Sequence, residues 1–109
     1  MITDEYIQQM LAKSKEYFIV VLMAGPNENS AYRQSLVWEH VRRNFELRQN
    51  KVLSIVCPVA ENPVIKGIGI FSVDKDEVKK LMDDDPTVKS GVFTYEILSA
   101  RSFPGDSLP

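Results

Sequence analysis

Cysteine is almost absent from this chain: Cys57 is the only one in 109 residues, so no disulfide can form within it. This excludes a disulfide-stabilised secreted domain and is typical of a protein from a reducing compartment. Cys57 lies in an apolar run, where we expect a buried, inert thiol rather than a nucleophile. Histidine is equally scarce, and one His with one Cys cannot form an ordinary zinc site.

The chain also lacks an excess of positive charge and a long apolar run. Lys and Arg number 13 against 15 Asp and Glu, which gives a net charge of −2. No electric field therefore attracts nucleic acid or an anionic membrane. No apolar stretch approaches the roughly 20 residues that span a bilayer. The start, MITDEY, has neither the basic nor the apolar region of a signal peptide. We expect a cytoplasmic protein with no nucleic-acid or membrane partner.

What the chain does contain is the composition of a globular protein, with 44% apolar and 26% charged residues. Its length supports one hydrophobic core but not two. Thr3 is a suitable N-cap for a first short helix that runs to about Lys13. We therefore expect an N-terminal helical extension over residues 1–16. A single domain over residues 17–109 follows, including a C-terminal tail over 99–109.

Strand and helix patterns alternate along the domain. Runs rich in β-branched and aromatic residues predict strands, and an apolar period near 3.6 residues predicts helices. Strands are predicted at 17–24, 52–59, 65–73 and 92–98, and helices at 30–49 and 74–82. Gly67 and Gly69 leave one face of the third strand bare, where another group can approach closely. The tail, ARSFPGDSLP, is rich in turn residues and predicts no regular element.

This order of elements is strand, helix, strand, strand, helix, strand. It predicts an α+β fold of the ferredoxin-like type, a four-stranded antiparallel sheet with both helices on one face. The first two strands are apolar on both faces, so the uncovered sheet face would expose an apolar surface that is unusual for a monomer. We therefore expect a homodimer that pairs through its sheet faces.

The predicted helix 30–49 has polar residues on its apolar side. Its apolar arc contains Leu36, Val37, Trp38, Val41, Phe45 and Leu47. Arg43 falls on the opposite, polar arc. Arg33, His40 and Asn44 lie inside the apolar arc instead, which indicates a polar pocket between this helix and the sheet.

Two interpretations of His40 are open. It can be a core histidine that bonds a backbone carbonyl, or a general acid or base, since imidazole ordinarily titrates near pH 6.5. The catalytic interpretation needs an orienting carboxylate, and Asp85 is the candidate. Arg33 can hold an anionic group of a substrate or pair with the acidic turn. Asn44 can hydrogen-bond either partner.

Three consecutive aspartates, Asp83, Asp84 and Asp85, fall where the second helix should end. Anions are disfavoured there by about 0.3–1 kcal/mol each, so the segment is either a solvated turn or a functional feature. Pro86 forces Asp85 into an extended conformation, which fixes the direction of its carboxylate. Adjacent aspartates rarely converge on one ion, and residues 66–69 lack the spacing of a phosphate loop. We therefore predict no metal and no cofactor.

The segment DDDPTVKSGVFTYEI, with His40 in the long helix and the SFPGDSLP tail, resembles the YCII-related family of the dimeric α/β-barrel superfamily. The resemblance covers roughly residues 17–109. It implies a ferredoxin-like protomer, dimerisation through the sheet and a pocket with a His–Asp pair, which falls on His40 and Asp85. Similar proteins mostly have no assigned activity, with some links to the breakdown of aromatic compounds. The chain departs from the family pattern at residues 50–51 and 57–59, where glycines are usual.

We therefore expect a small cofactor-independent enzyme. In this hypothesis His40 moves a proton on a small anionic or aromatic substrate, while Asp85 orients the imidazole. No nucleophile, metal or cofactor motif is visible, which favours a lyase, isomerase or dehydrochlorinase-like reaction. One alternative is a non-catalytic ligand-binding or structural homodimer, in which the pair is a buried hydrogen bond. Another is an accessory domain that works with a second protein.

Overall fold

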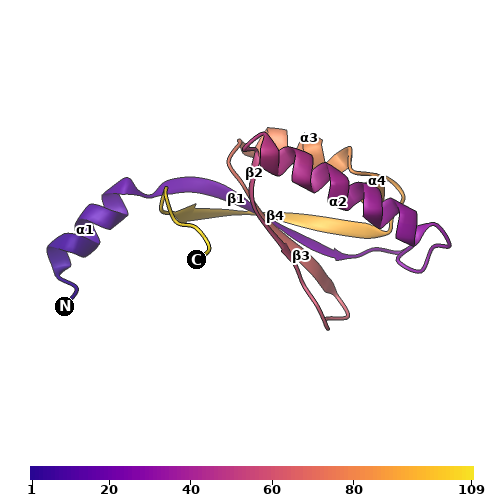
Figure 1. Cartoon of the computed structure of the whole chain (residues 1–109), viewed down its shortest axis with the longest axis horizontal. Coiled ribbons are helices and arrows are strands. Elements are labelled where there is room, and N and C mark those ends of the chain that lie inside the picture. Colours follow the sequence, from indigo (N-terminus) through magenta and orange to yellow (C-terminus); the bar gives the residue numbers. More distant parts are fainter.

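The computed structural model describes residues 1–109. Figure 1 shows one sheet whose one face is covered by helices, with a separate N-terminal helix projecting from its end. The elements in chain order are α1 (Asp4–Lys13), β1 (Lys15–Ala24), α2 (Arg33–Gln49), β2 (Leu53–Pro58), β3 (Ile65–Phe71), α3 (Lys75–Asp83), α4 (Pro86–Lys89) and β4 (Phe93–Ser102).

The sheet has four strands in the order β2-β3-β1-β4, and every neighbouring pair is antiparallel. This topology confirms the predicted α+β, ferredoxin-like fold. The apolar strand β1 is central, which accounts for its lack of polar residues. The short helix α4 was not predicted; it begins at Pro86, a residue favoured in the first turn of a helix because it needs no N–H partner there.

Two boundaries differ from the sequence prediction. Strand β4 continues to Ser102, so the prediction of an irregular tail is wrong for residues 99–102. Strand β1 begins at Lys15, inside the predicted extension. The two differences have one cause, because Lys15 pairs with Ser102 and Tyr17 with Ala100. Backbone groups form this ladder whatever their side chains, so the polar sequence gave no sign of it.

The hydrophobic core lies between the helices and the sheet. Its fully buried members are Val20, Leu22, Leu53, Phe71, Val78, Met82, Val92 and Phe93. On the helix-facing side of the sheet, Val20 is paired with Gly69 and Leu22 with Gly67. The two glycines therefore leave part of β3 without side chains beneath α2, as the sequence predicts.

Helix α2 faces the sheet with a polar residue. His40 is its one buried residue, whereas Trp38 is 63% exposed and Phe45 is 52% exposed. The prediction that Trp38 and Phe45 face the core is wrong. Trp38 lies two residues from His40, which is about 200° around the helix axis, so the rotation that buries His40 turns Trp38 to solvent.

The sheet face opposite the helices, which we call the open face, is largely apolar, although the register also places Thr94 and Glu96 on it. Strand alternation and register place on it Ile19, Val21, Ile55, Cys57, Ile68, Ile70 and Leu98. Leu98 is 48% exposed and Ile68 is 38% exposed. Cys57 is also exposed, so the prediction of a buried thiol is wrong for the single chain. The apolar run around Cys57 lies in an edge strand with one face uncovered.

Helix α1 stands apart from the rest of the molecule. Thr3 caps it as expected, accepting a hydrogen bond of 3.1 Å from the Tyr6 backbone N–H. None of its residues is buried, and Figure 1 shows it extending beyond the end of the sheet. The separate extension over residues 1–16 stays a prediction. None of the helices has both the length and the apolar character needed to cross a membrane.

Candidate active site

His40 and Asp85, 45 positions apart in the sequence, are neighbours in the fold. The Nδ1 atom of His40 lies 2.7 Å from Oδ2 of Asp85. His40 projects from the middle of α2, and Asp85 lies in the turn between α3 and α4 with the extended conformation that Pro86 imposes, φ −70° and ψ 134°. The side chain of Asp85 is fully buried, and that of His40 is 11% exposed.

The carboxylate of Asp85 has donors on both oxygens. Oδ1 accepts hydrogen bonds from Thr87, from its backbone N–H at 2.9 Å and its hydroxyl at 2.5 Å. Oδ2 accepts from His40 and lies 3.5 Å from a guanidinium nitrogen of Arg43. Burial is the largest influence and raises the pKa of Asp85, but the bonds from His40 and Thr87 and the charge of His40 outweigh it. The pKa of Asp85 is therefore lowered, and the carboxylate is ionised at neutral pH.

This carboxylate fixes the tautomer of the imidazole. An ionised carboxylate can only accept hydrogen bonds. Nδ1 therefore carries a proton, and this N–H group donates a hydrogen bond to Asp85. In the neutral ring the Nε2 atom then has a free lone pair, which accepts a 3.1 Å hydrogen bond from the side-chain amide of Asn44. Phe93 packs edge-on against the ring, with centroids 5.8 Å apart and planes at 72°. The ring is held on both sides, with Nε2 as its basic atom.

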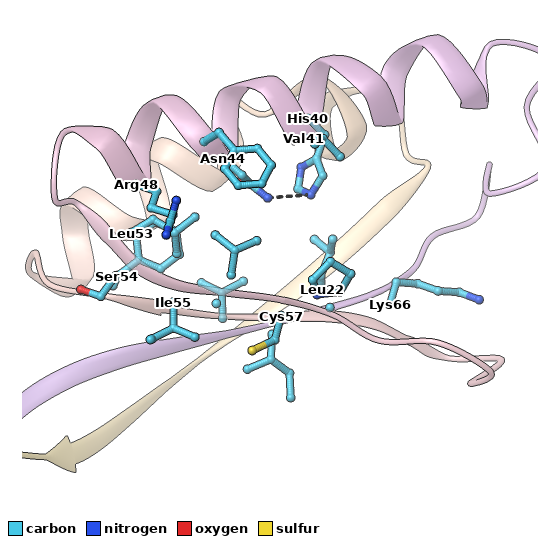
Figure 2. A pocket seen from close by; sticks show the side chains of 18 of the residues that line it. Leu22, His40, Val41, Asn44, Arg48, Leu53, Ser54, Ile55, Cys57 and Lys66 are labelled. Atoms are coloured by element: carbon cyan, nitrogen blue, oxygen red, sulfur yellow. Dashed lines mark hydrogen bonds between the residues drawn. The ribbon is translucent and has the colours of Figure 1, made fainter. Parts of the chain in front are cut away.

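A cavity of about 610 Å³ lies between α2 and the sheet, and His40 and Asn44 are part of its wall. Figure 2 shows both side chains reaching from α2 toward the sheet. Of the 23 lining residues, 14 are apolar; they include Val20, Leu22, Val37, Val41, Leu53, Val56, Phe71 and Phe93. Gly67 and Gly69 form part of the floor, and Asp85 lies behind the imidazole, outside the wall. The arrangement presents one basic nitrogen to an apolar space.

The cavity continues round the edge strand β2. Ile55 and Cys57, which Figure 2 shows pointing away from α2, line it together with Ser107 and Leu108 of the C-terminal tail. The cavity thus reaches the open face of the sheet.

The sequence prediction placed four residues at this site, and the structure brings three of them together. His40, Asp85 and Asn44 come together. Arg33 lies close by but does not line the cavity. Its guanidinium carbon lies over the Phe93 ring, 5.8 Å from the ring centre, which is a cation–π contact. Asn44 is a wall residue.

Two residues at the site were missed. Arg43, predicted on the polar arc, is only 20% exposed and reaches Asp85 because it lies at the edge of the buried face of α2. Thr87 was not considered, although Asp-Pro-Thr is a recognisable helix start: an Asp N-cap, Pro in the first turn, and an N–H two residues on. That signal could have shown that one oxygen of Asp85 is used by the backbone.

Asp83 and Asp84 each have a lysine partner, while Arg43 lies between Asp84, at 3.9 Å, and Asp85, at 3.5 Å. Asp83 pairs with Lys79 and accepts from the Tyr95 hydroxyl at 2.5 Å, and Asp84 lies 2.8 Å from the Lys89 ammonium group. The hydrogen bond from Lys79 is the main cause of the lowered pKa of Asp83. Burial, followed by Asp83, raises the pKa of Tyr95 to about 12. No three His, Cys, Asp or Glu side chains gather as metal ligands. The acidic segment instead ties α3 and α4 to their surroundings.

No protein-family model matches this chain, and no curated protein matches it either. A solved structure with the same fold is 5-chloro-2-hydroxyhydroquinone dehydrochlorinase (TftG) from Burkholderia phenoliruptrix AC1100, in complex with 2,5-dihydroxybenzoquinone. The similarity has a TM-score of 0.54 and covers 77% of this chain and 91% of the other, at 16% sequence identity. At that identity the likeness supports the fold alone.

Proposed function

We propose that this protein is a cofactor-independent enzyme in which His40 transfers a proton to or from a small organic substrate. One observation carries the proposal: Nδ1 of the single histidine is hydrogen-bonded to a buried, ionised carboxylate, while its imidazole belongs to the wall of a largely apolar cavity. A general base needs this combination, because the carboxylate holds the reactive tautomer and stabilises the imidazolium that forms. Asp85 is then a positioning residue, and His40 is the catalytic one.

The reaction class follows from what the cavity offers. Nε2 can remove a proton from a carbon next to the carbon that bears a leaving group. The electron pair of the broken bond then forms a double bond, and the leaving group departs with its own pair. If it is chloride, the balance is loss of HCl: the chloride leaves to water, and the proton held by His40 then passes to water, which restores the base. A lyase of this dehydrochlorinase-like type, or an isomerase that returns the proton, needs no further group. The activity named for the structural neighbour supports the first.

We also infer that two copies pair through the open face, as in a dimeric α/β barrel, and that the chain is a YCII-related protein. The exposed apolar side chains of that face support the pairing. A twofold axis would bring the open face of one chain against the open face of the other. The free, exposed Cys57 supports a location in the reducing cytoplasm.

His40→Asn tests the catalytic role, because an asparagine amide can still donate to Asp85 while removing the basic nitrogen. The probe is 5-chloro-2-hydroxyhydroquinone, the compound in the neighbour's name. We expect the wild-type protein to release chloride, and the variant to lose about 10²–10⁴-fold in rate. The melting temperature should change little. A variant as active as the wild type, or a wild-type protein without chloride release, would contradict the proposed reaction.

A second candidate is a non-catalytic binding domain. It is favoured by the hydrogen bond from Asn44, which already occupies the lone pair of Nε2. In that case the wild-type protein should bind the compound without releasing chloride, and His40→Asn should do the same. Asn44→Ala separates the two further: it frees Nε2 and should raise the rate of chloride release by an enzyme, whereas a binding domain should still release none.

A further inference from the structure

His40 and Asn44 are two members of a longer polar row on α2. Arg48 follows Asn44 by four residues, as Asn44 follows His40, so the three lie on one side of the helix, about 12 Å apart from first to last along its axis. All three line the cavity. Figure 2 shows them on the side of α2 that faces the sheet, with Arg48 beyond Asn44 from His40.

The cavity has cationic residues and no anionic ones. Not one of its 23 lining residues is Asp or Glu, although the chain as a whole has a net charge of −2. Apart from His40, its ionisable cations are Arg48 and Lys66. An apolar space with this charge balance favours an organic anion over a neutral or cationic ligand.

Neither cation is paired with a carboxylate, but Arg48 is the one whose side chain makes no hydrogen bond within the chain. Two other arginines of α2 are paired with carboxylates: Arg42 lies 3.6 Å from a carboxylate oxygen of Glu39, and Arg43 lies 3.5 Å from Asp85. The fourth, Arg33, lies over the Phe93 ring and does not line the cavity. No carboxylate lies within salt-bridge distance of Arg48. Lys66 donates to the backbone carbonyl of Asn62 at 3.0 Å, and Figure 2 shows it directed away from Arg48.

We propose that Arg48 binds the acidic group of an apolar organic acid, such as a ring carboxylate, while the reacting part of that molecule lies at His40. The guanidinium fork can bind both oxygens of a carboxylate, and helical side chains lean toward the N-terminus, which brings Arg48 toward Asn44. Asn44 lies between, within reach of a substituent of the ring. The assignment of the reacting part rests on the proposed function, whereas the anion site stands on geometry alone.

Equilibrium binding of two matched probes tests the proposal without requiring turnover. The probes are 4-hydroxybenzoate and its neutral amide, 4-hydroxybenzamide, each titrated by calorimetry. We expect the wild-type protein to prefer the carboxylate by about tenfold, as a partly exposed ion pair with a planar fork allows. Arg48→Gln should remove this preference, whereas Arg42→Gln, a paired arginine on the solvent side of the same helix, should keep it. Raising the salt concentration should weaken the preference in the wild type.

The single histidine reports where the probe lies. Both probes should shift the imidazole NMR signals of His40, because the benzene ring of each probe is bound beside this side chain. Equal affinity of the wild type for both probes, no binding at millimolar concentration, or a preference that survives Arg48→Gln would each overturn the proposal. So would loss of the preference in Lys66→Gln alone. His40→Asn should keep the preference, so an inactive enzyme with an intact anion site would refute only the proposed reaction.

Discussion

Asp85 is the residue on which the site depends most, because it is an ionised group with no contact with water. Four donors from three residues, His40, Arg43 and Thr87, surround its two oxygens. A buried carboxylate is stable only when its hydrogen bonds are complete. The same bonds that keep the charge inside the protein also fix the orientation of His40.

Replacing Asp85 by Asn should destabilise the protein and disturb the imidazole together. The new amide group would face the Nδ1 proton donor to donor, so the ring must change tautomer or turn. We expect the free energy of unfolding to fall by about 2–3 kcal/mol, the range for hydrogen bonds to charged groups, measured by urea denaturation. Asp84→Asn is the matched control. The carboxylate of Asp84 is next in the sequence but exposed to solvent, so this substitution should leave stability nearly unchanged. Equal effects of the two variants would contradict the role of Asp85.

Acid should unfold the protein through the same residue. The pKa of Asp85 is lower in the folded chain than its ordinary value of 3.8, because of its bonds to His40 and Thr87 despite the opposing effect of burial. Its contribution to stability is therefore complete above pH 3.8 and is lost as the pH falls through the folded-state pKa. Denaturation curves measured as the pH is lowered should fall more steeply for the wild type than for Asp85→Asn. Parallel pH profiles would show that Asp85 gains nothing from ionisation.

At the scale of single elements, helix α2 shows what the sequence can and cannot predict. Polar residues within its apolar arc indicated a polar pocket; His40 and Asn44 do line a cavity, but most of its wall is apolar. Their functional role stays a prediction. The rotation of the helix was not predictable, because the arc was broad and packing against α4 and β2 selects one part of it. Trp38 was therefore placed wrongly, and Arg43, at the edge of the buried face, was missed. The meeting of His40 with Asp85 was inferred from chemistry and resemblance, since no local pattern encodes a contact over 45 positions.

Strand β3 provides a prediction of its own, because its two glycines lie under the cavity with different amounts of room. A Cβ at Gly67 would have its nearest neighbour 3.5 Å away, whereas one at Gly69 would lie 3.0 Å from Cδ1 of the buried Leu53. Gly67→Ala should therefore fold normally yet weaken the binding of 4-hydroxybenzoate, because the methyl group enters the floor. Gly69→Ala should also lower stability, by about 1–3 kcal/mol through overpacking. Thermal unfolding and calorimetry of the two variants would distinguish them, and a Gly67→Ala that binds as well as the wild type would show that the ligand does not touch this floor.

At the scale of the whole molecule, the fold was predictable because apolar runs and periods marked the four strands and two main helices, and their order permits few topologies. The extra length of β4 was not, since it depends on pairing with the polar start of β1. The open face is the surface where apolar side chains are left exposed to solvent. Its apolar side chains belong to all four strands, so a partner that covers it must be wide and flat.

A charge in the middle of the open face should prevent the proposed pairing. Ile68→Lys places an ammonium group there at a site already 38% exposed in the single chain, so the fold itself should persist. We expect a wild-type dimer at micromolar concentration and a monomeric variant, measured by sedimentation. Ile7→Lys, on the exposed helix α1, serves as the control and should stay dimeric. A monomeric wild type, or dissociation by the Ile7 change, would argue against pairing through the sheet.

The position of Cys57 opposite Ile68 on that same face has a practical consequence. Its sulfur is open to solvent in one chain, yet it would be shielded wherever two sheets meet. The rate at which a maleimide dye labels the protein should then slow as the protein is concentrated. The lone thiol thereby becomes a built-in gauge of association, readable without any substitution.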